Sequence, residues 1–442
     1  MQRSPRPSPD SRHLASDEIA QEIEADARRE LDFIPAPLAP PALESPQVIL
    51  LTGATGFLGA FVLRDLLIHT AVRRVVCLVR SPGGTDEALR RLHDNLDRFE
   101  LVVSREAWSR VEVVTGDISA PQLGLDEETY SRLGDEVDTV IHCAASVNFY
   151  QSYRKLRTAN VESARQILRF AVHRRTKRLH YMSSTGVFDS DAGRGIVAHE
   201  TDAPAHCRGS VMGYTETKWV AEQLMLQARG RGLPTSIHRA PFILGDARGV
   251  VTRENLVVTM LLGSLQGGAW PTEDVTTPTI QVDALSRALV HLAQQPDPIG
   301  QTYHLISPEP ATWSTFGHAL RECGYPLDLV SYEDWKRRLR EFGRNPDNAM
   351  RPLVHFFTAT PRRHDRPVPD IFLKPPRPKL DTTATEAALR PVGLVPPPFD
   401  ADLMAIYLRY FVQQGWLHAP PGCPEPRQTD KADSRPPIIS VS

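Results

Sequence analysis

The stretch Val48-Ile49-Leu50-Leu51-Thr52-Gly53-Ala54-Thr55-Gly56-Phe57-Leu58-Gly59 decides the fold of this 442-residue chain. Its first four residues are an apolar run typical of a buried strand, and the residues after Gly59 are typical of a helix to about His69. Glycine lets the backbone turn tightly and approach phosphate groups, and a small residue at Gly59 lets helix and strand pack closely. We therefore predict a Rossmann turn that binds a dinucleotide pyrophosphate at the helix N-terminus. The predicted contacts are Gly53, Thr55, Gly56, Phe57, Leu58 and Gly59.

Short apolar runs alternate with helical segments on either side of this turn. The runs are 48–51, 75–79, 111–115, 139–143, 179–183 and 235–239. This alternation predicts an α/β fold, a Rossmann-type doubly wound parallel sheet covered on both faces. After residue 245 the alternation ends, and helices are expected around 252–266, 283–294, 313–323 and 332–342. They predict a smaller, mainly helical C-terminal substrate lobe that is interleaved with the first domain.

Composition changes divide the chain into four predicted segments. Residues 1–46 are expected to hold an N-terminal helix, capped by Ser16 and running to about Leu31, followed by a Pro-rich linker. Ile19, Ile23 and Ala27 recur at helical spacing and predict a narrow docking face. The nucleotide-binding domain is predicted over 47–245 and the substrate lobe over 246–419. The polar, Pro-rich residues 420–442 predict a disordered tail.

Composition excludes several classes of protein. With 41% hydrophobic and 24% charged residues, the chain is expected to be globular, and its net charge of −2 does not favour nucleic acid as a partner. Its five cysteines form no CxxC pair, so neither a disulfide framework nor a metal site is predicted. The N-terminal residues lack the apolar core of a signal peptide, and no apolar stretch is long enough to predict a membrane span. A cytoplasmic location is therefore expected.

Arg80, at the end of the second predicted strand, indicates which dinucleotide binds. NAD-specific Rossmann folds place an acid at about this distance from the glycines, whereas NADP-specific folds tend to place an arginine. Arg80 therefore favours NADPH. Either Arg90 or Arg91, on the following helix, is expected to give the 2′-phosphate a second guanidinium, and Arg91 is the preferred candidate. The alternative for each is an ordinary solvated helix arginine.

Tyr214 and Lys218 are spaced i, i+4 at a helix start, so their side chains lie on one face of that helix. They follow a Ser-rich strand end, Met182-Ser183-Ser184-Thr185. In a Rossmann chain a tyrosine in this position donates a proton or hydrogen bond to a carbonyl oxygen during hydride attack. A nearby ammonium group is expected to lower the pKa of that tyrosine, and a serine holds the same oxygen.

These motifs together resemble the thioester reductase family of the extended short-chain dehydrogenase/reductase superfamily. The family includes terminal reductase domains of nonribosomal peptide synthetases and the reductase domain of carboxylic acid reductases. The resemblance covers about residues 16–345. The stretches that are most specific to the family are residues 77–80, 116–118, 142–148 and 239–245. The chain departs from the common family pattern at Cys143 and at Ala240-Pro241, which affects the shape of the pocket.

The resemblance implies roles for individual residues. Ser184 lies four positions before Phe188, as the catalytic hydroxyl residue does in the family, with Thr185 as the alternative. Ser184, Tyr214 and Lys218 are thus the implied catalytic residues, and Tyr214 and Lys218 also contact the cofactor. The implied cofactor contacts further along the chain are Asp117 and Ile118 at the adenine, Ala144 and Ala145 after the fourth strand, and Pro241 and Ile243 at the nicotinamide.

The resemblance also implies the reaction and the partner. NADPH would reduce an acyl or peptidyl thioester, tethered to the phosphopantetheine arm of a carrier protein, to an aldehyde. Reduction by a second NADPH to the alcohol is the alternative outcome. The chain begins with its own Met1 and shows no carrier segment, so the carrier is expected to act in trans. Three basic clusters are candidate docking sites for an acidic carrier, although each is more simply a solvated face: residues 174–178, 336–340 and 362–366.

Two other functions fit the same motifs. One is an extended short-chain dehydrogenase/reductase that acts on a nucleotide sugar or an alcohol. The other is a non-catalytic protein that senses NADP. The intact Tyr214, Lys218 and Ser184 favour an enzyme over a sensor, since a sensor needs no proton donor.

Overall fold

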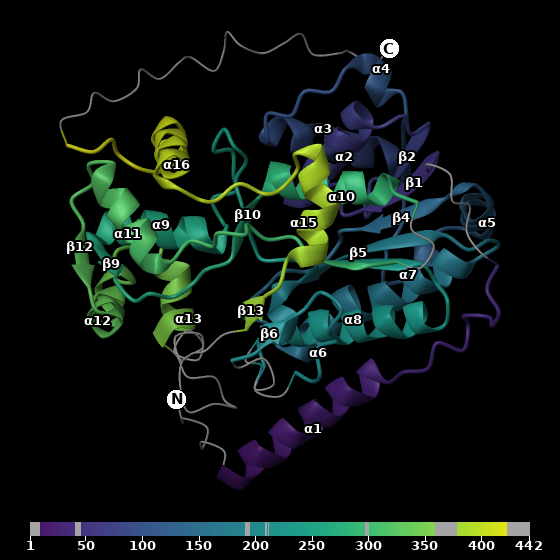
Figure 1. Ribbon diagram of the computed structural model, residues 1–442, viewed down its shortest axis with the longest axis horizontal. Helices are drawn as coiled ribbons and strands as arrows, with labels where there is room; N and C mark the ends of the chain where they lie inside the picture. The colour runs from purple at the N-terminus through teal and green to yellow at the C-terminus, as the bar shows by residue number, and fades with distance from the viewer. Residues whose placement is uncertain are drawn as a thin grey trace.

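The computed structural model describes residues 9–39, 46–190, 195–207, 210, 212–296, 300–358 and 378–421, and side chains from residue 17 onward. A seven-stranded sheet forms its centre (Figure 1). The strand order is β3-β2-β1-β4-β5-β7-β11, and every neighbouring pair is parallel. The strands are β1 (Val48–Thr52), β2 (Arg74–Val79), β3 (Val111–Thr115), β4 (Thr139–His142), β5 (Arg178–Ser184), β7 (Thr235–Ala240) and β11 (Thr302–His304). The predicted doubly wound sheet and all six predicted strands are confirmed.

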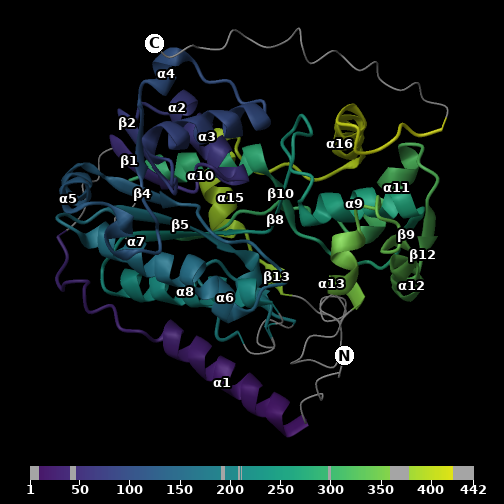
Figure 2. The same ribbon diagram turned by 180° about the vertical axis from the view of Figure 1, so that it is seen from behind.

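Helices cover both faces of the sheet because alternate strand residues point to opposite sides. Ile49 and Leu51 pack with α2 (Phe57–His69), α3 (Gly84–Arg98) and α10 (Val282–Gln294). Val48 and Leu50 pack in a second core with helices on the other face, which are α5 (Glu127–Glu136), α7 (Ser163–Val172) and α8 (Gly213–Gly230). Figure 2 shows the same two helical layers from behind.

A second group of elements lies beside one end of the sheet (Figure 1). It contains two short parallel strands, β9 (Ala269–Pro271) and β12 (Asp328–Val330). Its helices are α9 (Leu256–Gly267), α11 (Trp313–Glu322), α12 (Tyr332–Phe342), α13 (Val354–Thr358) and α16 (Ala401–Gln413). The helices predicted after residue 245 are confirmed within a few residues.

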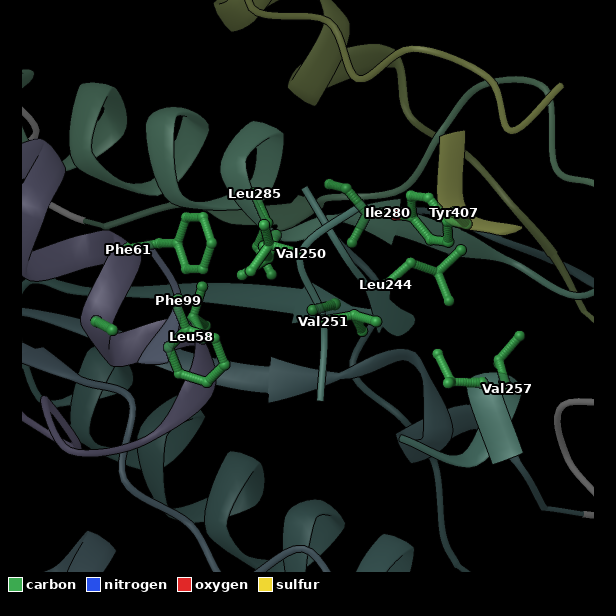
Figure 3. Close-up of a cluster of buried hydrophobic side chains, with 14 of the residues drawn as sticks. Leu58, Phe61, Phe99, Leu244, Val250, Val251, Val257, Ile280, Leu285 and Tyr407 are labelled. Carbon is green, nitrogen blue, oxygen red and sulfur yellow. The ribbon is translucent and has the colours of Figure 1, made fainter. Parts of the chain in front are cut away.

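The two groups share one hydrophobic core. Leu58 and Phe61 of α2 and Leu285 of α10 belong to the same buried cluster as Ile280 and Tyr407 (Figure 3). The Tyr407 hydroxyl, on α16, also donates a 2.6 Å hydrogen bond to the carbonyl oxygen of Gly245. The C-terminal helix therefore packs directly behind the end of β8 (Phe242–Leu244).

The N-terminal helix differs from the prediction. Helix α1 spans Pro9–Ala27, so Ser16 lies inside it and is not its cap. Proline suits the first position of a helix, where its missing N–H would have no partner, and serine costs little inside a helix. The helix also ends earlier than predicted, because Leu31 and Ile34 turn inward and are buried.

Several predictions concern residues outside the described part of the chain. Pro40 and Pro41 of the predicted linker lie there, and so do residues 422–442 of the predicted disordered tail. Among the described residues, no helix is both long and apolar enough to cross a membrane.

Candidate active site

The glycine turn lies at the C-terminal edge of the sheet, beside the point where the strand order reverses. β1 is an interior strand, with β2 on one side and β4 on the other. In open α/β sheets, ligands bind in the crevice outside the strand ends at such a point. Gly56 forms the N-cap of α2, so the first N–H groups of this helix open toward the crevice.

Close backbone contacts show why the turn needs glycine. Gly53 has a φ of +82°, and a Cβ atom there would lie 2.7 Å from the backbone nitrogen of Ala144. A Cβ atom on Gly59 would lie 1.9 Å from the carbonyl oxygen of Gly53. Neither position therefore has room for a side chain. The turn forms a cradle of bare backbone, which fits a pyrophosphate.

Asn95, on α3, supports this cradle and was missed in the sequence analysis. Its Nδ2 donates to the carbonyl oxygens of Ala54 at 3.1 Å and Gly56 at 3.0 Å. Leu92 and Leu96 beside it are buried. A polar residue on the apolar face of a helix was the signal in the sequence that could have found it.

The loop after β4 forms the opposite wall of the crevice. The backbone N–H of Ala144 lies 3.4 Å from the Thr52 hydroxyl, which is 2.7 Å from Nδ1 of His142. Burial, with a smaller contribution from the nearby Lys218, lowers the pKa of His142 to about 3, so this imidazole stays neutral. Ala145 follows directly in the same loop.

Asn160 fixes the next part of that loop and was also missed. Its Oδ1 accepts from the Ser146 N–H at 2.7 Å, and its Nδ2 donates to the Ser146 carbonyl at 3.1 Å. The same Nδ2 donates to the Thr217 hydroxyl on α8 at 2.9 Å. A single buried amide thus joins the loop to the helix that carries Tyr214 and Lys218.

Of the two candidate arginines on α3, the structure brings Arg91 to Arg80. Arg91 donates a hydrogen bond to the Arg80 carbonyl oxygen, and the Arg80 side chain is exposed at the end of β2. Arg90 instead makes an exposed ion pair with Asp94 at 3.1 Å. Arg80 and Arg91 can therefore face one phosphate group together, and Arg90 belongs to the helix surface.

Asp117 and Ile118 follow β3 on the same edge of the sheet. The Asp117 carboxylate accepts hydrogen bonds from the Ser119 hydroxyl at 2.7 Å and the Ser119 N–H at 2.9 Å. These bonds, with a smaller contribution from Arg80, lower the pKa of Asp117. It is therefore an anionic acceptor at neutral pH. Ile118 is half-buried against the core below it.

Lys218 is buried on α8, and its ammonium group points at the end of β5. Its Nζ donates a 2.5 Å hydrogen bond to the Met182 carbonyl and lies 4.3 Å from the centre of the Tyr181 ring. Burial lowers the pKa of Lys218 to about 7. A base with such a pKa exchanges its proton near neutral pH.

The pKa of Tyr214 differs from the prediction. A neighbouring ammonium was expected to lower it, but burial of the hydroxyl raises the pKa of Tyr214 to about 12. The cause of this shift is the cost of burying a phenolate. Tyr214 is therefore protonated at neutral pH, which suits a hydrogen-bond or proton donor.

Ser184 ends β5 next to the start of α8. Its Oγ accepts from the Gly186 N–H at 3.1 Å and caps the short helix η3 (Thr185–Phe188). A Cβ atom on Gly186 would lie 2.8 Å from the Thr215 side chain, so η3 packs against the first turn of α8. Ser184 and Thr185 are both half-buried, and both remain candidates for the hydroxyl that works with Tyr214.

Pro241 and Ile243 lie where β7 continues into β8. Both are half-buried, and the Ile243 carbonyl accepts a 2.7 Å hydrogen bond from Asn255, the N-cap of α9. This bond ties the strand end that would border a nicotinamide to the first helix of the C-terminal group.

An aromatic contact from the C-terminal group reaches Tyr214. The Phe149 ring lies edge-on to Tyr214 at 5.8 Å and 6.4 Å from the ring of Phe356, on α13. Tyr150, which is 49% exposed, donates a hydrogen bond to the Pro352 carbonyl at 3.2 Å. Phe356 was not predicted from the sequence, since no local pattern connects it to the loop that carries Phe149 and Tyr150.

The three basic clusters that were considered as docking sites for a carrier protein differ in the contacts of their side chains. Lys177 and Arg178 of the first cluster are buried, and Arg175 pairs with Asp138, so these three side chains are used within the fold, whereas Arg174 is exposed. In the second cluster, ion pairs join Lys336 to Glu333, Arg337 to Asp334 and Arg338 to Asp328. The third, 362–366, lies outside the described residues.

Comparisons with known proteins agree on the family. A family model described as "Male sterility protein", an NAD-binding family, matches residues 51–289. The chain is 32% identical to a linear gramicidin synthase of Brevibacillus parabrevis and 34% identical to isonitrile lipopeptide synthase of Streptomyces coeruleorubidus. Each match covers 90% of this chain but only 8% and 26% of the relative, respectively.

Two solved structures are similar over nearly the whole described fold. The terminal R domain from the myxalamid PKS-NRPS biosynthetic pathway has a TM-score of 0.82 at 34% identity, and the match covers 91% of this chain and 100% of that one. The reductase domain of a nonribosomal peptide synthetase from Mycobacterium tuberculosis has a TM-score of 0.70 at 25% identity and covers 90% and 99%.

Proposed function

Since this chain belongs to the thioester reductase family of the extended short-chain dehydrogenase/reductase superfamily, we propose that it reduces a carrier-bound acyl or peptidyl thioester with NADPH and releases an aldehyde. The binding of a nicotinamide cofactor follows from the family. The observation that carries the reaction is the placement of Tyr214 and Lys218 on one face of α8, beside Ser184 at the end of β5. That arrangement lies at the edge of the sheet where the glycine cradle opens.

The proposed chemistry uses few protein groups. The bound cofactor supplies a hydride to the thioester carbonyl carbon. Tyr214 and Ser184 donate hydrogen bonds to the carbonyl oxygen as it gains negative charge, and a proton from Tyr214 completes the hemithioacetal. Breaking the C–S bond then gives the aldehyde and the free pantetheine thiol. Lys218 holds the ribose of the nicotinamide and returns a proton toward Tyr214.

We assign the remaining contacts by position. The backbone of Gly53–Gly59 would hold the pyrophosphate, Asp117 and Ile118 the adenine, and Ala144 and Ala145 the wall after β4. Pro241 and Ile243 would border the nicotinamide. The preference for NADPH over NADH rests on Arg80 and Arg91, whose side chains start from adjacent positions at the end of β2 and on α3. The Arg80→Ala variant should weaken NADPH binding about tenfold or more and leave NADH binding unchanged.

The proposed partner is a phosphopantetheinylated carrier protein that binds in trans. The proposed domains are the nucleotide-binding domain over 47–245 and the substrate lobe over 246–419. Pairing of β11 with β7 supports their interleaving, because this strand comes from beyond residue 245. Phe356 supports a substrate site between them, since it brings the lobe to the loop beside Tyr214.

The test incubates the protein and NADPH with an acyl-pantetheine thioester, then with a nucleotide sugar and a simple alcohol in the presence of NADP. Thioester-dependent loss of NADPH absorbance is expected, and Tyr214→Phe should lower kcat at least about a hundredfold without changing NADPH affinity. Turnover of the sugar or alcohol alone would overturn the proposal in favour of another reductase. Cofactor binding without any turnover would favour a sensor. NADPH consumed per product distinguishes aldehyde from alcohol.

A further inference from the structure

Glu222 continues the row of functional side chains on α8. Tyr214, Lys218 and Glu222 are spaced by four residues, so all three lie on one face of the helix. Glu222 is fully buried, with no exposed side-chain surface. Its Oε1 accepts from Arg239 at 3.0 Å from Nε and 2.7 Å from Nη2, and its Oε2 accepts from the Ser183 hydroxyl. The reaction described above assigns no role to this carboxylate.

Contacts to α8 hold consecutive residues at the end of β5. The Met182 carbonyl accepts from Lys218, and the Ser183 hydroxyl donates to Glu222. Ser184 comes next, and because strand side chains alternate, its hydroxyl faces away from Ser183. Glu222 thus fixes the residue immediately before the candidate catalytic serine.

Arg239 is held from several sides. Arg239 on β7 lies directly beside Ser183 on β5 in the register of the sheet. Its Nη2 donates to the Asp202 carbonyl at 2.7 Å, and its Nη1 lies 2.9 Å from Nε2 of His304. Nδ1 of His304 lies 2.6 Å from the Asp381 carbonyl, so Nδ1 carries the proton and Nε2 accepts from Arg239. Burial lowers the pKa of His304 to about 4, so it is neutral.

The electrostatic surroundings of Lys218 leave Glu222 as its main stabilising anion. Burial lowers the pKa of Lys218, whereas Glu222 raises it, with a smaller contribution from the Cys143 thiol. His142 on β4 is neutral, and Tyr181 on β5 presents only its ring. The Glu222 carboxylate forms an ion pair with Arg239 at 2.7 Å, and it acts through its charge on Lys218, which lies one helical turn away on the same face of α8.

We propose that Glu222 is a positioning residue for hydride transfer: through Ser183 it fixes the strand position of Ser184, and its charge favours the ammonium form of Lys218. This role rests on the proposed function for the thioester step only. The charge effect concerns the nicotinamide cofactor, because an ammonium group binds the ribose better than an amine does. It can therefore be measured without any thioester.

The test separates charge from geometry with three variants. Glu222→Gln removes the charge and keeps a side chain of the same length. Ser183→Ala keeps the charge and removes the link to the strand. Glu200→Gln is the matched control, because Glu200 is also a buried carboxylate, but its oxygens accept from the backbone N–H groups of His304, Ala384 and Thr385, and its charge is not among the causes of the Lys218 pKa shift. NADPH affinity is measured by cofactor fluorescence from pH 5 to pH 9, and kcat is measured with a thioester. Titration of the NADPH phosphate is common to all variants and cancels in the comparison.

NADPH affinity should fall at alkaline pH as the Lys218 ammonium group loses its proton. Glu222→Gln should move this fall to lower pH. A shift of one pH unit weakens binding about tenfold at pH 8 and leaves it unchanged at pH 5. Ser183→Ala should keep the wild-type profile and lower kcat, and Glu200→Gln should change neither. If Glu222→Gln does not fold, Glu222→Asp replaces it. That variant should keep the pH profile, since the charge remains, and should lower kcat like Ser183→Ala, since the shorter chain cannot reach Ser183.

An unshifted affinity profile in Glu222→Gln would overturn the charge effect, and so would a shifted profile in Glu222→Asp. A wild-type kcat in Ser183→Ala would overturn the effect on Ser184. Failure of the thioester reaction in every protein, with the shift in NADPH affinity intact, would instead reject the proposed function and leave the charge effect of Glu222 standing.

Discussion

Replacing Gly59 by alanine should separate α2 from β1. The added Cβ atom would lie 1.9 Å from the carbonyl oxygen of Gly53, 2.6 Å from its carbonyl carbon and 2.8 Å from the Cα atom of Ala54. All three atoms belong to the backbone, so no side-chain rotation relieves the contact. The helix or the turn has to move as a unit.

The size of the effect follows from a comparison within the same turn. A Cβ atom on Gly56 would lie 3.2 Å from that same oxygen, with a backbone φ of −98° that alanine adopts freely. Gly59→Ala must therefore open the turn by about 1.3 Å to reach an equally tolerable contact, in a closely packed interior. We expect a loss of about 2 to 3 kcal/mol in unfolding free energy for Gly59→Ala, and less than about 1 kcal/mol for Gly56→Ala.

The assay is urea unfolding of the protein without cofactor, followed by fluorescence titration with NADPH. Gly230→Ala is the control for the substitution itself, since a Cβ atom at Gly230 meets nothing within 4 Å. This variant should be as stable as the parent or slightly more stable. Equal unfolding midpoints for the Gly59 and Gly56 variants would refute the argument, because the two positions would then tolerate a methyl group equally.

Three further outcomes are expected. Lys218→Met should abolish turnover yet raise the Tm of the cofactor-free protein. Burial lowers the pKa of this lysine from 10.5 to about 7, so the lysine destabilises the folded state increasingly as pH falls from 10.5 to 7, and by a constant amount below pH 7. The gain in Tm of Lys218→Met should follow the same profile. A gain in Tm that is largest above pH 10.5 would contradict this reasoning. The Asp26 carboxylate on α1 accepts hydrogen bonds at 2.6 Å from both Tyr153 and Arg157 on α6 (Tyr153–Arg157), so Asp26→Ala should release α1 from the rest of the fold. Limited proteolysis of this variant should then cut α1 before any other described helix. Asn95→Ala should weaken NADPH binding several-fold with little change in Tm, and an unchanged affinity would show that the turn holds its shape without the two amide hydrogen bonds.

The sheet was predictable because its strands are continuous apolar runs. A parallel strand buried on both faces needs such a run, and Val48–Thr52 and Arg74–Val79 supply it. The glycine turn was predictable for a similar reason, since backbone contact with phosphate requires glycine at fixed spacing. Strand β11 was missed, because three residues carry no period and only pairing with β7 makes them a strand.

The parts of the site that escaped prediction are contacts between distant segments. Asn95 and Asn160 act on backbone far from them in the sequence, and Phe356 reaches Tyr214 only through Phe149. Glu222 and Arg239 look like ordinary charged residues, since their complete burial depends on how α8 packs over β5 and β7. The Tyr214 pKa was predicted wrongly because desolvation depends on three-dimensional burial.

The strand β11 has a consequence for how the chain folds. It forms the outer edge of the sheet, yet α9, β9, β10 (Thr279–Gln281) and α10 all lie between it and β7 in the sequence. During synthesis the outer side of β7 therefore stays unpaired until residue 304 has left the ribosome. An open edge of this kind is a template for pairing with other chains, and parallel pairing between distant segments forms slowly. Aggregation during expression or refolding should therefore begin at β7, and slower synthesis at lower temperature should reduce it.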